Sequence, residues 1–253
     1  MKSFVRSSFS LVAVLVFPLC LQAQGGAPMI TNDGGTPGNG HWEIDIVAGG
    51  SGSGGEKSFY APDLDLNYGV GSRMQIKLEF PYLWENGGAG NSWRSGLGNS
   101  TLGFKWRFRD DDAHGPGLSI YPHLELHNPG SRAFDRGLVG TAPKLLIPVE
   151  ITHQFGPLGV DTEVGYNIVS DGTDQTVYGF LLGGRPIQAL ELMGEIYGTN
   201  AVSGDDHTVF ANLGTRVHFT PFVGLIASGG HTVAVSSNEP RSWIGYAAVQ
   251  LTF

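Results

Sequence analysis

Residues 73–84 read RMQIKLEFPYLW, and this stretch decides the fold. One parity is apolar and the other is polar through most of it: Met74, Ile76, Leu78, Phe80, Tyr82 and Trp84 against Arg73, Gln75, Lys77 and Glu79. Successive side chains of a β-strand point to opposite faces, so a strand here has one wholly apolar face and one charged face. A helix would not gather these apolar residues on one side. The stretch predicts a strand between an apolar and a polar environment.

The same alternation recurs along the chain. It predicts twelve strands, near residues 41–49, 59–68, 73–84, 100–109, 118–127, 144–155, 160–168, 177–184, 189–198, 208–219, 222–229 and 242–253. Strands of roughly ten residues with this alternation are typical of transmembrane β-barrels. In a soluble sandwich the strands lie closer together along the chain, with a new strand about every 8–12 residues.

The connectors are expected to alternate in length. Tight turns are predicted at 69–72, 156–159, 185–188 and 220–221, and longer Gly-rich loops at 50–58, 85–99, 128–143 and 230–241. Short turns on one side and long loops on the other are the pattern of an outer-membrane barrel. In hydrocarbon a sheet must close on itself, because unpaired backbone groups are not tolerated there. The predicted fold class is all-β: a transmembrane antiparallel up-and-down barrel of about 12 strands.

Aromatic residues at the strand ends favour the same orientation. Tyr82, Trp84 and Trp243 fall toward the loop side, while Trp42, Tyr68, Trp106, Phe108, Phe155, Phe219 and Phe253 fall toward the turn side. Such residues form belts at the two membrane interfaces. The alternative is a soluble barrel with an aromatic core. Because strand after strand offers an apolar face suited to lipid, we favour the membrane barrel.

The amino-terminal residues have the organisation of a secretory signal. Lys2 and Arg6 precede an apolar run over residues 9–21, and Ala23 offers a cleavage site before Gln24. We expect residues 1–23 to be a signal peptide, residues 41–253 to be the barrel, and the Gly/Pro-rich segment 24–40 to lie in the periplasm or the lumen. Cys20 is the only cysteine, so the exported chain would contain no disulfide.

The composition excludes several classes of protein. Charged residues make up only 15%, the formal net charge is −8, and 41% of residues are hydrophobic. A nucleic-acid-binding protein would carry a basic excess, and a disordered chain would lack the apolar content. After residue 23 no apolar run is long enough for a transmembrane helix.

The last strand is similar to the terminal strand of Gram-negative outer-membrane proteins. Its alternate residues are Trp243, Gly245, Ala247, Val249, Leu251 and Phe253. The resemblance implies a location in the cell outer membrane of a Gram-negative bacterium and insertion by the barrel assembly machinery. Trp243, Val249, Leu251 and Phe253 would form the assembly signal.

A narrower resemblance spans almost the whole exported chain. It rests on Ile30-Thr31-Asn32-Asp33, Thr36-Pro37-Gly38, Gly40-His41-Trp42-Glu43-Ile44, Pro81-Tyr82, Gly96-Leu97-Gly98-Asn99 and Gly103-Phe104-Lys105. These motifs resemble a family of outer-membrane transporters labelled by a proposed link to the meta pathway of phenol degradation. The resemblance implies a barrel and a transport role.

Charges on the polar parity are the candidate functional residues. The residues expected to line the lumen, and so a solute path, are Arg73, Lys77, Glu79, Lys105, Arg107, Arg109, Glu125, Asp161, Glu163, Glu191 and Glu195. Glu43, Asp45, Asp63 and Asp65 lie on the strands beside the basic cluster. A basic wall facing an acidic wall would create a transverse field in a pore. The alternative is neutralisation between adjacent strands in a plugged lumen.

The sequence contains only weak matches to known catalytic motifs. The spacing of Gly50, Gly52 and Gly55 fits a dinucleotide loop, but no helix-forming segment follows. His123 and His127 would lie roughly 13 Å apart on a strand, too far to share a metal ion. No Gly-x-Ser-x-Gly elbow occurs, and His153 is the one histidine suited to a Ser/His pair on the outer wall. The sequence predicts no cofactor, no metal site and no catalytic residue.

These observations predict a non-enzymatic outer-membrane channel or transporter for small solutes, aromatic and other small organic compounds included. Its partners would be outer-membrane lipids, the assembly machinery and an unidentified small solute, with no nucleic acid. The alternatives are a lipid-modifying barrel enzyme and a closed structural or surface-recognition barrel.

Overall fold

The computed structural model describes residues 26–87, 92–236 and 240–253, and it is built from strands. The predicted signal peptide lies outside the described residues. No described helix is long and apolar enough to cross a membrane.

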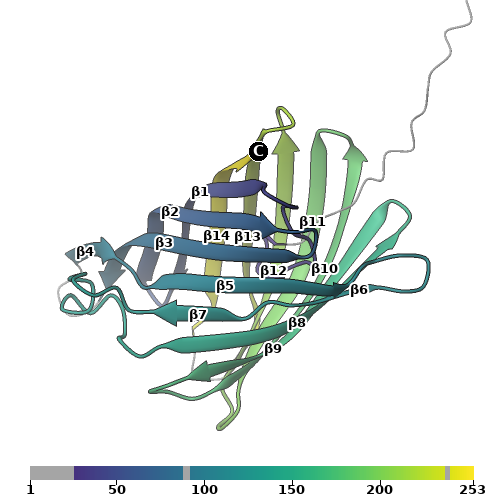
Figure 1. Cartoon of the computed structure of the whole chain (residues 1–253). Coiled ribbons are helices and arrows are strands. Elements are labelled where there is room, and N and C mark those ends of the chain that lie inside the picture. The colour runs from purple at the N-terminus through teal and green to yellow at the C-terminus, as the bar shows by residue number, and fades with distance from the viewer. Residues whose placement is uncertain (1–25, 88–91, 237–239) are drawn as a thin grey trace, which may run out of the picture.

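The strands follow the chain as an up-and-down series (Figure 1). They are β1 Trp42–Ser53, β2 Glu56–Val70, β3 Met74–Gly87, β4 Ser92–Leu97, β5 Ser100–Arg109, β6 Gly117–Ile120, β7 His123–Leu126, β8 Lys144–Phe155, β9 Leu158–Val169, β10 Gln175–Ile187, β11 Leu190–Ala201, β12 His207–His218, β13 Val223–Val235 and β14 Ser242–Thr252. β4 and β5 both pair with β3, and β6 and β7 both lie between β5 and β8. Each of these pairs forms one interrupted barrel strand, which confirms the predicted antiparallel 12-stranded barrel.

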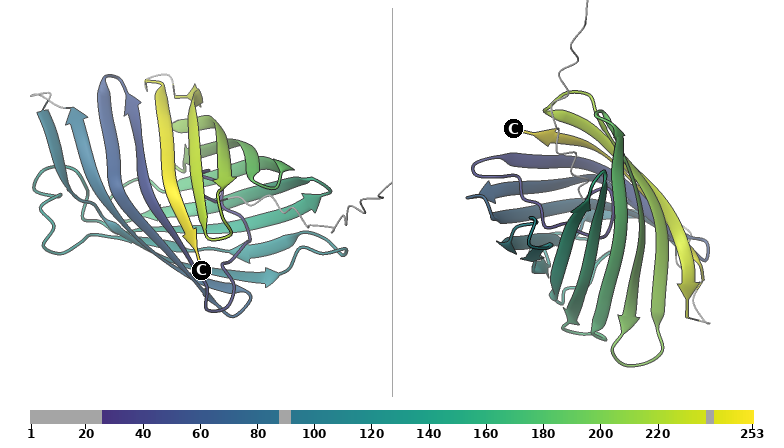
Figure 2. Two further views of the ribbon diagram at one scale, coloured as in Figure 1. Left: turned by 90° about the horizontal axis from the view of Figure 1, so that it is seen from above. Right: turned by 90° about the vertical axis from the view of Figure 1, so that its right-hand side faces the viewer.

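The barrel is closed by pairing of its first and last strands. β1 runs antiparallel to β14 over the whole length of both strands. At the turn side, Trp42 N donates to Phe253 O at 2.7 Å and Phe253 N donates to Trp42 O at 3.0 Å. Figure 2 shows the sheet curling round on itself. Every strand therefore has two neighbours, which removes the sheet edges.

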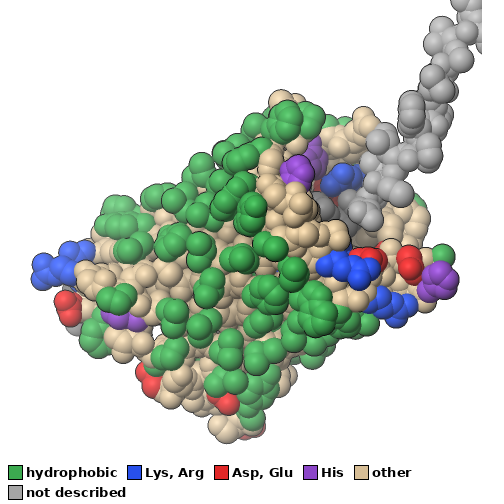
Figure 3. All heavy atoms as spheres, in the orientation of Figure 1, with side chains coloured by type: hydrophobic (Ala, Val, Ile, Leu, Met, Phe, Trp, Pro, Cys, Tyr) green, Lys and Arg blue, Asp and Glu red, His purple; other side chains and the backbone are tan. Residues whose placement is uncertain are grey.

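The apolar parity faces outward, as predicted. Leu78 and Phe104 are 40% and 45% exposed, whereas their chain neighbours Lys77 and Lys105 point inward, and Lys105 is 3% exposed. Hydrophobic side chains cover the visible wall in Figure 3, and charged ones gather mainly toward its two ends. The outer surface is therefore suited to lipid, and the polar side chains fill the interior.

Three predicted long loops are wrong in whole or in part: 50–58, 85–99 and 230–241, the last because β13 continues to Val235. The stretch 50–58 is a tight hairpin, with Gly54 and Gly55 at φ of 58° and 94° between the paired residues Ser53 and Glu56. Two-residue hairpin turns need such positive φ values. Within β1, a side chain at Gly52 would collide with the Trp243 indole on β14. Glycine here accommodates aromatic neighbours, although its abundance suggested a loop.

The predicted loop 85–99 is also wrong, because residues 85–87 belong to β3 and residues 92–97 form β4. β3 and β4 pair from Tyr82 with Leu97 to Gly87 with Ser92. The predicted loop 128–143 is confirmed, because no strand is assigned within it.

Candidate functional site

The described amino-terminal segment, residues 26–40, lies inside the barrel, and we call it the plug. Carboxylates of the wall accept hydrogen bonds from its backbone. Glu195 on β11 accepts from Ile30 N at 2.9 Å and Thr31 N at 2.8 Å. Glu163 on β9 accepts from Asn32 N and Asn32 Nδ2 at 3.1 and 2.9 Å. Residues 30–32 therefore lie against the inner face of β9 and β11.

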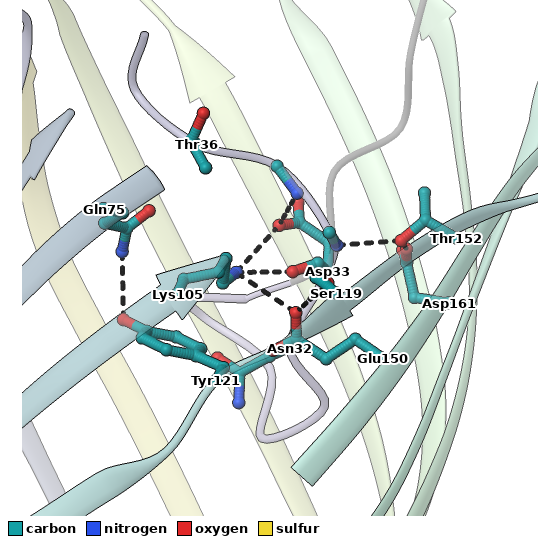
Figure 4. Close-up of polar contacts among 12 residues, drawn as sticks. Asn32, Asp33, Thr36, Gln75, Lys105, Ser119, Tyr121, Glu150, Thr152 and Asp161 are labelled. Carbon is teal, nitrogen blue, oxygen red and sulfur yellow. Dashed lines mark hydrogen bonds and ion pairs between the residues drawn. The ribbon is translucent and has the colours of Figure 1, made fainter. Parts of the chain in front are cut away.

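Basic wall residues bind the carbonyl groups of the plug. Lys105 on β5 donates to Asp33 O and forms ion pairs with the Asp33 and Glu150 carboxylates at 3.5 and 3.6 Å (Figure 4). Arg216 on β12 donates to Ala27 O at 2.7 Å. Backbone N–H groups of the plug thus bind acidic side chains of the wall, and backbone carbonyls bind basic ones, which holds the segment in one position.

Glycines in the wall allow the plug to approach closely. A Cβ atom at Gly179 on β10 would collide with the Thr31 side chain, and one at Gly214 on β12 would collide with Met29. Thr31 is fully buried and Met29 is buried. The β8–β13 part of the wall is therefore packed against the plug.

The opposite part of the lumen is open. A cavity of about 590 Å³ lies between the plug and the wall formed by β14, β1, β2 and β3, and Lys105, Tyr121, His123 and Arg216 complete its lining. It reaches the turn side at Thr36 and Thr252. We call the wall residues of β14 and β1–β3 that line it the open wall.

Two further cavities extend toward the loop side. The middle one, about 260 Å³, shares Lys77, Glu79 and His123 with the large cavity. The outer one, about 530 Å³, shares Lys144 and Asn167 with the middle one. The three cavities therefore follow one another from the loop side to the turn side, past the plug.

The open wall is acidic. Its register places Asp45 on β1 opposite Asp65 on β2, and Asp65 opposite Glu79 on β3. Lys77 donates to Asp65 at 2.8 Å and pairs with Glu79 at 2.9 Å. One lysine therefore compensates two of the three carboxylates in this row.

The predicted lumen residues fall into separate groups. Lys77, Glu79, Lys105, Arg107, Asp161, Glu163, Glu191 and Glu195 lie inside the barrel, and Glu125 lies toward the loop side, bound by Lys144 at 3.1 Å. Of the basic residues, Lys105 and Arg107 bind the plug, and Lys77 pairs with its neighbouring strand. Lys77 and Lys105 line the large cavity together with carboxylates of the open wall, and each of the two lysines is itself paired with a carboxylate.

Arg73 and Arg109 lie at the turn side rather than in the lumen. Arg73 is in the β2–β3 turn, where it pairs with the exposed Asp110, and its hydrogen bond holds the pKa of the Asp110 carboxyl below its ordinary value. Arg109 donates to His114 O at 2.8 Å. Alternation along the strands predicted that both side chains point to the polar face. It could not show that Arg73 and Arg109 lie where β3 begins and β5 ends, at the turn side.

Sequence reasoning missed several interior residues. Glu150 is fully buried on β8 and accepts from Ser119 Oγ at 2.5 Å, while Tyr60 and Tyr246 line the large cavity. The alternation Val149, Glu150, Ile151 could have indicated Glu150. The two tyrosines carry no such signal, because aromatic side chains fit either face.

His153, the histidine considered for a Ser/His pair on the outer wall, instead joins a turn to β8. His153 Nδ1 lies 2.5 Å from Asp111 Oδ1, and Asp111 Oδ2 accepts from Gln154 N at 2.9 Å. The ring stacks edge-on against Phe155 at 4.4 Å. This contact attaches the 110–116 turn to β8.

Comparison with solved structures supports the fold. The chain is similar to an outer membrane channel of Pseudomonas putida F1, with a TM-score of 0.64, 16% identity, and coverage of 92% of this chain and 100% of the other. The KdgM porin gives 0.54 and 9% identity, covering 83% and 99%. The CymD monoaromatic hydrocarbon channel gives 0.51 and 9% identity, covering 85% and 89%. No protein-family model and no curated protein sequence matches the chain.

Proposed function

We propose that this chain is an outer-membrane channel through which small polar solutes pass beside the plug. The observation that carries the proposal is the series of three cavities with shared lining residues, which extends from the loop side to the turn side. Polar groups line this route, and a fixed plug narrows it, as expected for a selective pore.

The membrane location rests on the outer surface. Leu78, Phe104 and their equivalents present an apolar band to the surroundings. Aromatic side chains are exposed near both ends, among them Trp84 and Trp243 at the loop side and Trp106 and Phe155 at the turn side. Outer-membrane lipids are the partner that fits such a surface.

Assembly follows from the last strand. Val249 faces outward on β14, and Phe253 pairs with Trp42 where the barrel closes. We propose that Trp243, Val249, Leu251 and Phe253 are recognised by the barrel assembly machinery, and that deletion of Phe253 lowers the folded yield.

The lining favours one class of solute. Carboxylates of the open wall attract polar and cationic molecules more than hydrocarbons or anions. The resemblance to transporters linked to the meta pathway of phenol degradation would extend the range to aromatic solutes that carry polar groups.

Two adjacent residues of β5 test the route. Thr101 lines the middle cavity, whereas Leu102 is 45% exposed on the lipid face. Thr101→Cys and Leu102→Cys are prepared in the exported chain, reconstituted in a planar bilayer and treated with a bulky water-soluble thiol reagent. We expect the reagent to reduce the conductance of Thr101→Cys and to leave that of Leu102→Cys unchanged. Absence of conductance in the untreated protein, or equal effects on both variants, would contradict the proposal.

A further inference from the structure

The open wall contains a buried carboxylate that has no hydrogen-bond partner. Asp45 is 1% exposed, it lines the large cavity, and no described donor is in close hydrogen-bonding geometry with its carboxylate oxygens, although Gln250 stands opposite it on β14 with its own Nε2 unpaired. Asp63 Oδ1 is likewise buried and unpaired at the same cavity. A buried charge is normally paired, because it loses its hydration without compensation otherwise. These carboxylates therefore have hydrogen-bonding capacity that the protein leaves unused.

The basic residues around the cavity are engaged elsewhere. Lys77 binds Asp65 and Glu79, Arg216 binds Glu191 at 3.1 Å and Ala27 O, and Lys105 binds the plug and Glu150. The cavity lining as described has six carboxylates and three basic groups: Asp33, Glu43, Asp45, Asp63, Asp65 and Glu79 against Lys77, Lys105 and Arg216. By formal count the lining therefore has three more carboxylates than basic groups.

Two tyrosines make the site suited to an organic cation. Tyr60 on β2 and Tyr246 on β14 are both paired in register with Gly49 on β1, and both line the cavity. They pack against the apolar group Val47, Ile226 and Ala248. Gly49 has no side chain to separate the two tyrosines. Aromatic rings and carboxylates together bind ammonium and guanidinium groups.

We infer that Asp45 and Asp63, with Tyr60 and Tyr246, form a subsite for a small organic cation that carries a primary ammonium or guanidinium group on a short apolar body. This inference rests on the proposed function in one respect: the ligand reaches the subsite through the lumen. A cavity of about 590 Å³ is in the usual range for a small molecule. Among the described residues no group of three or more His, Cys, Asp or Glu side chains could hold a metal ion.

Calorimetric titration of the folded protein in detergent tests the subsite. The probe is diaminobutane, and butanediol is its uncharged counterpart of the same length. We expect saturable binding of the diamine and none of the diol. Asp45→Asn and Asp63→Asn should each weaken diamine binding by roughly tenfold or more, because each removes a charge-assisted hydrogen bond. The matched control is Asp161→Asn, a buried carboxylate of the packed wall held by Thr152 Oγ1 at 2.6 Å; its affinity should stay within about twofold.

Three results would overturn the inference: no saturable binding to protein whose unheated gel mobility shows a folded barrel, equal affinity in Asp45→Asn, or displacement of the diamine by an equal concentration of magnesium. The bilayer recording separates this inference from the proposed function. Protein that conducts without binding the diamine is a channel that lacks this subsite. Protein that binds the diamine without conducting has the subsite and is not a channel.

Discussion

The two halves of the lumen use the same residue type in opposite ways. On the packed wall, Glu163 and Glu195 are buried and accept hydrogen bonds from the plug backbone. On the open wall, Asp45 is equally buried and its oxygens have no partner. Glu163 and Glu195 hold a segment of the chain, whereas Asp45 lines a cavity. A buried acidic residue in a barrel is therefore interpreted from its partners and not from its burial.

The packed wall and the open wall differ in this way only if the polar parity faces inward. An arginine near the bilayer midplane on the lipid face costs about 2–4 kcal/mol. Leu78→Arg should therefore lower the free energy of unfolding by that amount, whereas Lys77→Arg, at the adjacent lumen position, should have little effect. Urea unfolding in lipid vesicles, followed by tryptophan fluorescence, measures both. Equal losses in the two variants would mean that the faces are assigned wrongly.

Removing a charge from the packed wall should destabilise the protein. Glu195→Gln replaces an acceptor of two plug amides and of Asn212 Nδ2 by a neutral amide of the same shape. Hydrogen bonds to charged groups contribute about 1.5–3 kcal/mol, so we expect a loss of this order in the free energy of unfolding. The same urea experiment measures it, and an unchanged midpoint would show that the plug is not held by Glu195.

The same substitution on the open wall should have the opposite sign. Asp45→Asn removes a buried charge that has no partner, so the free energy of unfolding should stay constant or rise by up to about 1 kcal/mol in the absence of ligand. A loss as large as that of Glu195→Gln would contradict the difference between the two walls.

Ion preference gives the smallest expected effect. The excess of carboxylates on the open wall should make the pore cation-selective. Asp63→Asn should lower the potassium-to-chloride preference, measured as the reversal potential in a KCl gradient, and Asp161→Asn on the packed wall should not. Equal shifts would indicate that solute passes along both walls.

Most of the barrel could be predicted because alternation directly records which face meets lipid. The range 144–155 agrees with β8 at both ends, and Lys77 and Lys105 lie inside as expected. Alternation identifies a face and does not identify a neighbour. It could not show that the plug would bind Lys105 or that Asp45 would line a cavity.

The errors have a common physical cause. Glycine is read as a loop former, yet Gly52 on β1 makes room for Trp243 and Gly179 on β10 makes room for Thr31. Both contacts join residues distant in sequence. The open cavity depends on the position of the plug, which is fixed by contacts across the lumen and has no local sequence signal.

In the proposed channel, solute passes beside a plug that stays in place. A Cβ atom at Gly34 of the plug would lie 3.7 Å from Thr152 Cβ on β8, and native disulfides join Cβ atoms about 3.8 Å apart. Gly34→Cys combined with Thr152→Cys should therefore lock the plug to β8 on oxidation, with each single variant as a control. Single-channel conductance is recorded before and after oxidation, and again after reduction. We predict the same conductance in all three states; loss of conductance on oxidation and its return on reduction would show that the plug must leave the lumen before solute can pass.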